Sequence, residues 1–351
     1  MTGQKKIFSP LELKKRLLAN EDQNETILSF QNQIHRILNG HDPRILLIVG
    51  PCSIHNPDSA IEYATKLQAL GVEVSDTFFI VMRTYFEKPR TINGWKGFLY
   101  DPHLNGTYDI ETGLYRSRKL LLDLCSLKMA TATEFLDPST SDYISDLISW
   151  GCIGARTAES QIHRQLASKL NLPISFKNST SGHVETAING ILVAKQAHTY
   201  LGINQAGCLS SIVTSGNSSC HLTLRGGNNK TNYDPESIFK ALNRLEKANL
   251  PKRLLVDCSH GNSNRNPSNQ SVVFQSIIHQ IIEGNRNIKG MILESELKSG
   301  CQSIPDDLTN LQYGVSVTDA CIDFKTTETL IRWAAEKLKK NETLTSSKIC
   351  E

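Results

Sequence analysis

The chain has 351 residues, enough for one large α/β barrel or for two domains, and we expect one domain. Its 38 Lys and Arg nearly balance its 35 Asp and Glu, which excludes a general electrostatic attraction to nucleic acid or to a membrane surface. No apolar run approaches the roughly 18 residues of a membrane span, and the N-terminal residues lack the apolar core of a signal peptide. The 9 cysteines are scattered without a CxxC pair, so we expect reduced thiols in a cytoplasmic protein.

Residues 1–40 predict a helical extension ahead of the first core strand. Ser9 and Pro10 fit the cap and first turn of a helix over LELKKRLL, and a second amphipathic helix is expected around residues 25–38. A barrel is expected over residues 41–338. The last residues, 339–351, lack an apolar pattern, so we expect a disordered tail.

From residue 44 onwards, short apolar or β-branched runs alternate with stretches of helical periodicity. The expected strands are 44–50, 78–82, 129–135, 152–156, 174–178, 221–225, 253–260 and 290–297. The expected helices after them are 57–70, 114–125, 141–150, 159–170, 183–197, 235–248, 270–284 and 326–340. The strand–helix unit occurs eight times, which predicts a TIM (β/α)8 barrel.

One segment falls outside this alternation. Residues 199–214 carry β-type residues on both sides of Asn204-Gln205-Ala206-Gly207. This pattern predicts a β-hairpin inserted between the fifth and sixth barrel strands.

A loop rich in cations follows the second expected strand. It places four cations beside a single acid, namely Arg83, Lys88, Arg90 and Lys96 beside Glu87. Arg90 and Thr91 offer a planar guanidinium and a hydroxyl to one phosphate group. The loop therefore suits an anionic ligand, and the alternative is a solvated basic surface.

The residues that leave the expected strands are unusually polar. In chain order they are Cys52, Arg83, Glu134, Arg156, Lys177, Arg225, His260 and Glu294. In a TIM barrel these positions meet at one end, where the chemistry takes place. Several cations around one opening repel one another unless an anion fills it, so we expect a multiply anionic ligand.

Three strand-end residues and one loop residue form a candidate metal site: Cys52, His260, Glu294 and Asp319. Thiolate, imidazole and carboxylate ligands suit a divalent transition metal such as manganese, iron, cobalt or zinc, and disfavour magnesium and calcium. Each residue also has a structural interpretation: Cys52 as a buried thiol, His260 as a core histidine and Asp319 as a helix cap. The position of three of them at strand ends favours the metal site.

Short motifs keep a recognisable order and spacing from about residue 42 to residue 338. They are GPCSIH (50–55), EKPRT (87–91), GWKG (94–97), IGART (153–157), FKN (176–178), LRGG (224–227), DCSHGNSN (257–264), ILES (292–295) and SVTDAC (316–321). In these motifs the chain resembles the type I, metal-dependent DAHP synthases. The resemblance implies a TIM barrel that condenses phosphoenolpyruvate with erythrose 4-phosphate and water to 3-deoxy-D-arabino-heptulosonate 7-phosphate, at the entry to the shikimate pathway.

The resemblance implies metal ligands and contacts to phosphoenolpyruvate. The four candidate ligands named above would hold manganese, iron or cobalt. Arg83 and Lys177 would bind the carboxylate of phosphoenolpyruvate, and Arg156 and Arg225 would bind its phosphate.

The resemblance also assigns the second substrate and the proton transfers. Arg90 and Thr91 would bind the phosphate of erythrose 4-phosphate, with Lys88 between the two substrates. Glu134 would orient the water that adds to phosphoenolpyruvate. Lys88 and His260 are both eligible as the proton donor to the new alkoxide.

Two loops depart from the pattern of close relatives. The chain has FKNSTSG (176–182) where they have FKNGTDG, and GNSSC (216–220) where they have an aspartate in place of the second serine. Each change removes an aspartate near the site. The acids and cations named above are all present, so we expect an active enzyme.

In the family, an aromatic amino acid binds a separate pocket built from a helix, the inserted hairpin and the N-terminal segment of a neighbouring subunit. The candidate effector residues are Ser141, Asn171 and Gly202. GINQAG (202–207) and YGVSV look most like the tyrosine-inhibited branch, so tyrosine is the expected effector. Ser141 stands where that branch has proline, and Asn171 where it has serine, which leaves a pocket without an effector as the alternative. A homodimer or homotetramer is also implied.

Two other functions remain as alternatives. A sister synthase joins phosphoenolpyruvate to arabinose 5-phosphate, but it typically carries an asparagine-bearing segment in place of Arg90-Thr91. A non-catalytic regulatory subunit that binds an aromatic amino acid is disfavoured because the candidate metal ligands are intact.

Overall fold

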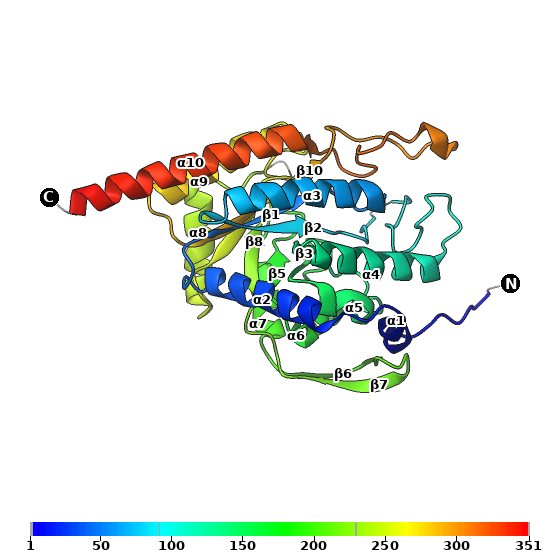
Figure 1. Cartoon of the computed structure of the whole chain (residues 1–351). Helices are drawn as coiled ribbons and strands as arrows, with labels where there is room; N and C mark the ends of the chain where they lie inside the picture. The colour runs from blue at the N-terminus through cyan, green and yellow to red at the C-terminus, as the bar shows by residue number, and fades with distance from the viewer. Residues whose placement is uncertain (1–2, 91, 229, 350–351) are drawn as a thin grey trace.

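The computed structural model describes residues 3–90, 92–228 and 230–349, and the side chains only as far as residue 341 (Figure 1). The barrel strands are β1 (Ile45–Gly50), β2 (Phe78–Arg83), β3 (Ala130–Glu134), β4 (Trp150–Ile153), β5 (Ile174–Lys177), β8 (His221–Leu224), β9 (Leu254–Asp257) and β10 (Ile288–Glu296). Each pairs in parallel with the next, and β10 pairs with β1, so the barrel is closed. The predicted TIM barrel is confirmed.

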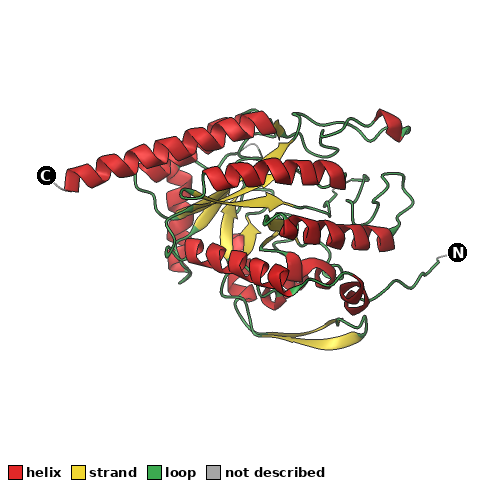
Figure 2. Ribbon diagram, in the orientation of Figure 1, coloured by secondary structure: helices red, strands yellow, loops and turns green. Residues whose placement is uncertain are grey.

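Helices follow the strands and cover the outside of the barrel (Figure 2). They are α3 (Pro57–Glu73), α4 (Ile110–Ser126), α5 (Ser141–Ile144), α6 (Gln161–Lys169), α7 (Glu185–Ala194), α8 (Pro235–Lys247), α9 (Asn269–Ile282) and α10 (Phe324–Ile349). The short strand β11 (Ile322–Asp323) precedes α10 and pairs with β10. None of the helices in the described residues is long and apolar enough to cross a membrane.

The barrel strands are buried on both faces, because successive side chains point alternately inward and toward the helices. In β1, Leu46 and Ile48 belong to one core cluster and Leu47 and Val49 to another. The first cluster also includes side chains of α2 (Glu21–Leu38), such as Ile34. Helix α2 of the N-terminal extension therefore shares this core cluster with the barrel strands.

The other N-terminal helix, α1 (Pro10–Arg16), begins with the predicted cap. Ser9 and Glu12 form a capping box, in which each side chain bonds to the backbone of the other. The predicted hairpin is formed by β6 (His198–Ile203) and β7 (Leu209–Thr214), outside the barrel sheet. The backbone N–H of Leu11 donates to the carbonyl of Gln205 at 2.8 Å, so α1 rests on the tip of the hairpin.

Two expectations about helices differ from the structure. The helix expected over residues 141–150 is wrong: α5 ends at Ile144, a 3-10 turn follows over Ser145–Leu147, and Trp150 begins β4. The indole of Trp150 is fully buried and donates to His221 at 3.0 Å, so tertiary packing overrides the helical pattern. At the other end of the chain, α10 continues to Ile349 through residues expected to be disordered, where no proline or glycine ends a helix.

Candidate active site

Three of the four predicted metal ligands meet where the barrel strands have their C-terminal ends, here called the mouth. Cys52 follows β1, Glu294 lies in β10, and Asp319 comes from the loop before β11. Their ligand atoms all lie within 4.8 Å of one another. Cys52 and Glu294 are buried whereas Asp319 is exposed, so the cluster opens toward the mouth.

His260, the fourth predicted ligand, lies beside this cluster. Its Nε2 is 3.8 Å from a carboxylate oxygen of Glu294. Its Nδ1 is 3.0 Å from the carboxylate of Asp257, which orients the ring so that Nε2 faces Glu294. His260 also has a φ of 55°, a backbone conformation that L residues rarely adopt.

The donor set fits a transition metal ion. Burial and the neighbouring Glu294 raise the pKa of the Cys52 thiol to about 11, so a nearby cation is needed to make it a thiolate at neutral pH. Thiolate, carboxylate and imidazole donors together suit manganese, iron, cobalt or zinc better than magnesium or calcium.

Two cations contact this cluster directly. Lys88 Nζ lies 3.2 Å from Cys52 Sγ, and Arg83 Nη2 donates to Glu294 at 3.0 Å. Burial alone would lower the pKa of Lys88, but Cys52, Glu294 and Asp319 outweigh that effect and raise it. Lys88 is therefore held as an ammonium ion next to the candidate metal ligands. Arg83 is buried, and its Nη1 has no hydrogen-bond partner among the described residues.

Lys177 forms a buried ion pair with Asp257 at 2.7 Å. Burial would raise the pKa of Asp257, but Lys177 and His260 lower it well below its ordinary value. Asp257 thus joins a predicted substrate residue to a predicted metal ligand. Asp257 is not among the site residues predicted from the sequence. It ends β9 within the motif DCSHGNSN, so it has the same strand-end position as the residues that were predicted.

Two arginines that follow barrel strands, Arg156 after β4 and Arg225 after β8, lie close enough for their charges to interact. Arg225 is buried, and its pKa is lowered by burial and by the charges of Arg156 and Arg265, although Asp257 opposes this. Arg156 is exposed. Mutual repulsion of these guanidinium groups favours an anion between them. Asn178, also missed from the sequence, accepts from the backbone N–H of Arg225 at 2.8 Å and so fixes its position.

The loop after β2 is held in a closed shape. The backbone N–H of Lys88 donates to Lys96 at 3.0 Å, and Arg90 Nε donates to the carbonyl of Trp95 at 2.7 Å. At Gly97, where φ is 110°, a Cβ atom would lie 2.2 Å from the carbonyl oxygen of Phe86, so only glycine fits. Arg90 is exposed, and Thr91 lies outside the described residues.

Glu134 ends β3 and is half-buried at the mouth. Its carboxylate lies against Gly154, where a Cβ atom would come within 2.0 Å of Oε1. The glycine of the motif IGART therefore makes room for this carboxylate.

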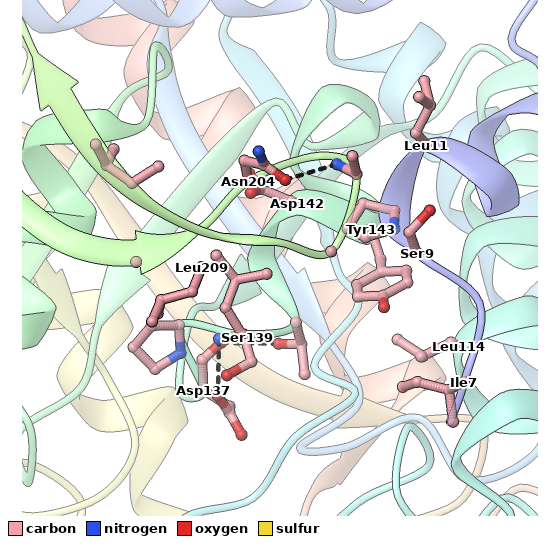
Figure 3. A pocket seen from close by; sticks show the side chains of 18 of the residues that line it. Ile7, Ser9, Leu11, Leu114, Asp137, Ser139, Asp142, Tyr143, Asn204 and Leu209 are labelled. Atoms are coloured by element: carbon pink, nitrogen blue, oxygen red, sulfur yellow. Dashed lines mark hydrogen bonds between the residues drawn. The ribbon is translucent and has the colours of Figure 1, made fainter. Parts of the chain in front are cut away.

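A separate cavity of about 860 Å³ lies between the N-terminal segment, α5, α6 and the hairpin (Figure 3). Gly202, a predicted effector residue, lines it. Ser141 does not: it is fully buried and donates to the carbonyl of Pro138 at 2.9 Å. Asn171 lines a different cavity of about 410 Å³. The structure therefore brings only one of the three predicted effector residues to the large cavity.

The wall of this large cavity is mixed in character. Apolar side chains such as Leu114 and Leu209 line it together with Tyr143 and with the ion pair Lys169–Asp142, whose charged atoms are 2.6 Å apart. Tyr143 donates to the carbonyl of Phe8 at 2.7 Å, which attaches the N-terminal segment of the same chain to the cavity.

Comparisons with known proteins agree on one family. The family model described as the DAHP synthetase I family matches residues 20–332. The tyrosine-sensitive phospho-2-dehydro-3-deoxyheptonate aldolase of Escherichia coli is 46% identical over 332 residues, covering 95% of this chain and 93% of its own length. The phenylalanine-sensitive enzyme of the same organism is 44% identical over 335 residues, covering 95% of each chain.

Solved structures agree with the sequence relatives. The phospho-2-dehydro-3-deoxyheptonate aldolase of Francisella tularensis matches with a TM-score of 0.93 at 41% identity, over 96% of this chain and 98% of its own. The family model covers most of the chain, and the relatives match along nearly their whole length. The chain belongs to the DAHP synthetase I family.

Proposed function

We propose that the mouth of the barrel is the active site at which this chain condenses phosphoenolpyruvate with erythrose 4-phosphate and water to 3-deoxy-D-arabino-heptulosonate 7-phosphate and phosphate. Family membership supports the reaction. The observation that carries the location is the cluster of Cys52, Glu294 and Asp319, with Lys88 and Arg83 in contact with it.

Phosphoenolpyruvate is proposed to bind with its carboxylate at Arg83 and Lys177. Both cations are buried and each has an acid partner, so their charge is held in place before the substrate arrives. Nη1 of Arg83, which has no partner in the part of the chain that the structure describes, would donate to a carboxylate oxygen. The phosphate is proposed to bind between Arg225 and Arg156, where the repulsion between the guanidinium groups is relieved by a dianion.

Erythrose 4-phosphate is proposed to bind with its phosphate at Arg90 and Thr91, on the loop after β2. Arg90 is exposed and its Nε is fixed on Trp95, which leaves the two terminal nitrogens of the guanidinium for a phosphate. Lys88 belongs to the same loop, and its ammonium group lies at the metal cluster, where the aldehyde of the sugar would be.

Cys52, His260, Glu294 and Asp319 are proposed to hold a divalent metal ion, either manganese, iron or cobalt. Such an ion would act as a Lewis acid on the aldehyde oxygen, where negative charge develops as the new bond forms. Lys88 is the better proton donor to that oxygen, because it is an ammonium ion in this site whereas Nε2 of His260 would be occupied by the metal. Glu134 is proposed to orient the water that adds to C2.

The substrate assignment is tested by incubating the purified protein with phosphoenolpyruvate and either erythrose 4-phosphate or arabinose 5-phosphate. We expect loss of phosphoenolpyruvate and release of phosphate with erythrose 4-phosphate. A preference for arabinose 5-phosphate would support the sister synthase, and loss with neither sugar would support a non-catalytic subunit.

The large cavity is proposed to bind an aromatic amino acid, with tyrosine favoured over phenylalanine and tryptophan. Its apolar side chains suit an aromatic ring, and Asp142 and Lys169 provide opposite charges for an amino group and a carboxylate. Relatives named tyrosine-sensitive and phenylalanine-sensitive support an effector of this kind. A homodimer or homotetramer in the cytoplasm is proposed from the same family resemblance.

A further inference from the structure

Glu87 and Lys88 are consecutive residues whose side chains reach different sites. Lys88 Nζ donates to the carbonyl oxygen of Cys52 at 3.0 Å, next to the candidate metal ligands. Glu87 Oε2 lies 3.1 Å from the hydroxyl of Thr140, which also contacts the carbonyl oxygen of Asp137 at 2.9 Å, and Thr140 lines the large cavity. Glu87, which contacts the cavity-lining Thr140, is therefore one peptide bond away from Lys88 in the active site.

The carboxyl group of Glu87 is buried in an unusual environment. Glu87 is 2% exposed, and besides Thr140 its carboxyl group interacts with the backbone N–H groups of Leu136 and Asp137 and with the hydroxyl of Tyr100. No ion pair to a cation is found for Glu87 among the described residues, and the charge beside it is that of Asp137. Burial and Asp137 raise the pKa of Glu87 to about 8, so it is mainly a neutral acid at pH 7. A buried acid beside another acid, with no cation partner among the described residues, costs stability, which favours a role in function.

Hydrogen bonds join the polar residues that lie between Glu87 and the large cavity. Tyr100 donates to Oδ2 of Asp137 at 2.5 Å. The backbone N–H of Ser139 donates to Oδ1 of Asp137 at 2.8 Å, and Figure 3 shows these two residues side by side. Tyr100, Asp137 and Thr140 all line the cavity. A ligand that moves these residues would therefore change both the contact between Thr140 and Glu87 and the distance from Glu87 to the charged Asp137.

On the active-site side, the loop after β2, to which Glu87 belongs, is described over residues 86–90 and 92–97. Its two backbone-fixing bonds, from Lys88 to Lys96 and from Arg90 to Trp95, join the two arms of the loop. A displacement of Glu87, at the start of this loop, would therefore move Lys88 and Arg90 together.

We infer that Glu87 is a positioning residue: its hydrogen bond with Thr140 fixes the loop that presents Lys88 and Arg90 to the substrates, and a ligand in the large cavity acts on the active site through this contact. The inference rests on the proposed function for the identity of the substrates and of the effector. Glu87 would act through Lys88 and Arg90, and it is not proposed to contact either substrate.

The positioning role is tested with Glu87→Ala, Glu87→Gln and Thr140→Val. Loss of the carboxyl group in Glu87→Ala, or of the hydroxyl in Thr140→Val, is expected to raise the KM for erythrose 4-phosphate about tenfold, with the KM for phosphoenolpyruvate changed less than about twofold. Glu87→Gln keeps the size and an acceptor for Thr140, so its kinetics are expected to stay near those of the parent protein. Ser139→Ala is the matched control, because it changes the same wall and leaves the Glu87–Thr140 bond intact.

A purely structural role would lower the melting temperature of Glu87→Ala and leave the ratio of the two KM values unchanged. That result, or equal defects in Glu87→Ala and Glu87→Gln, would overturn the positioning role. Metal content is measured in each variant to confirm that the metal cluster is retained.

The coupling role is tested by measuring tyrosine binding by calorimetry and tyrosine inhibition by initial rates. Glu87→Ala is expected to bind tyrosine like the parent protein while losing most of the inhibition. Full inhibition in Glu87→Ala would overturn the coupling. If the parent protein binds no tyrosine, the proposed effector fails, and the KM ratio alone then decides whether Glu87 positions the loop.

Discussion

The ammonium group of Lys88 lies 3.2 Å from the thiol of Cys52. This pair joins the loop after β2 to the end of β1, and so joins the proposed sugar-phosphate site to the proposed metal site. The same ammonium also donates to the carbonyl oxygen of Cys52 at 3.0 Å, which leaves a third hydrogen for a substrate oxygen.

Lys88→Met keeps the length and apolar stem of the side chain and removes its charge. If Lys88 gives a proton to the new alkoxide, kcat is expected to fall by about 100-fold or more. Metal content and melting temperature are expected to change little. The matched control is Lys96→Met, since Lys96 lies in the same loop with its ammonium 5.8 Å from the ring centre of Tyr108. Equal losses in both variants would argue against a specific role for Lys88.

Arg90→Ala and Arg225→Ala separate the two substrate phosphates. Each variant is expected to lose a charge-assisted contact of about 1.5–3 kcal/mol, roughly a 10- to 150-fold rise in one KM. Arg90→Ala should raise the KM for erythrose 4-phosphate, and Arg225→Ala the KM for phosphoenolpyruvate. Steady-state kinetics with each substrate varied in turn provide the measurement. Similar rises in both KM values for both variants would mean that the two sites are misassigned.

Metal binding is expected to strengthen as the pH rises. The pKa of Cys52 is raised to about 11, so at lower pH the thiol must lose a proton before it can bind a metal ion. From about pH 7.5 to about pH 9, above the ordinary pKa of histidine, the Kd for Mn²⁺ is expected to fall about tenfold per pH unit. Calorimetry in buffers of different ionisation enthalpy would also detect the released proton.

Cys52→Ser is the control for that titration, because a serine hydroxyl does not ionise in this range. Its Kd is expected to be larger and its pH dependence shallower. A Kd for the parent protein that does not change with pH would contradict a thiolate ligand.

Tyrosine is expected to inhibit more strongly than phenylalanine or tryptophan at equal concentration. Inhibition requires that the effector binds the less active state better. Removal of residues 1–15 should weaken it, because residues 6–12 form part of the cavity wall and Tyr143 bonds to Phe8. Initial rates at saturating substrates give the comparison. Stronger inhibition by either of the other amino acids, or an unchanged response after truncation, would exclude this account of the cavity.

The barrel was predictable because its strands are short apolar runs separated by clear helical patterns, and the pattern repeats along the chain. The end of the helix expected over residues 141–150 was not predictable, since Trp150 is drawn into the barrel by packing against His221, far away in the sequence. Local periodicity carries no information about such a contact.

The site was predictable to the extent that strand ends identify residues at the mouth. Cys52 and Glu294 were found in this way, Asp319 was found on the loop after the eighth strand, and the three meet in the structure. Asp257 was missed because its role depends on Lys177, a residue on a different strand. Ser141 was expected at the effector cavity from family resemblance alone, and whether a side chain faces a cavity or the core depends on packing that the resemblance does not determine.

The most direct test of the proposed active site is the rate of phosphoenolpyruvate loss with erythrose 4-phosphate, measured with protein stripped of metal by a chelator and then with manganese, iron or cobalt restored. The four proposed ligands predict no turnover by the stripped protein, recovery with added metal, and no recovery in Cys52→Ala. Cys125→Ala, which removes a buried thiol of α4, serves as the control and should recover. Full turnover by the metal-free protein would contradict the proposed metal site and the proposed requirement for a metal ion in the reaction.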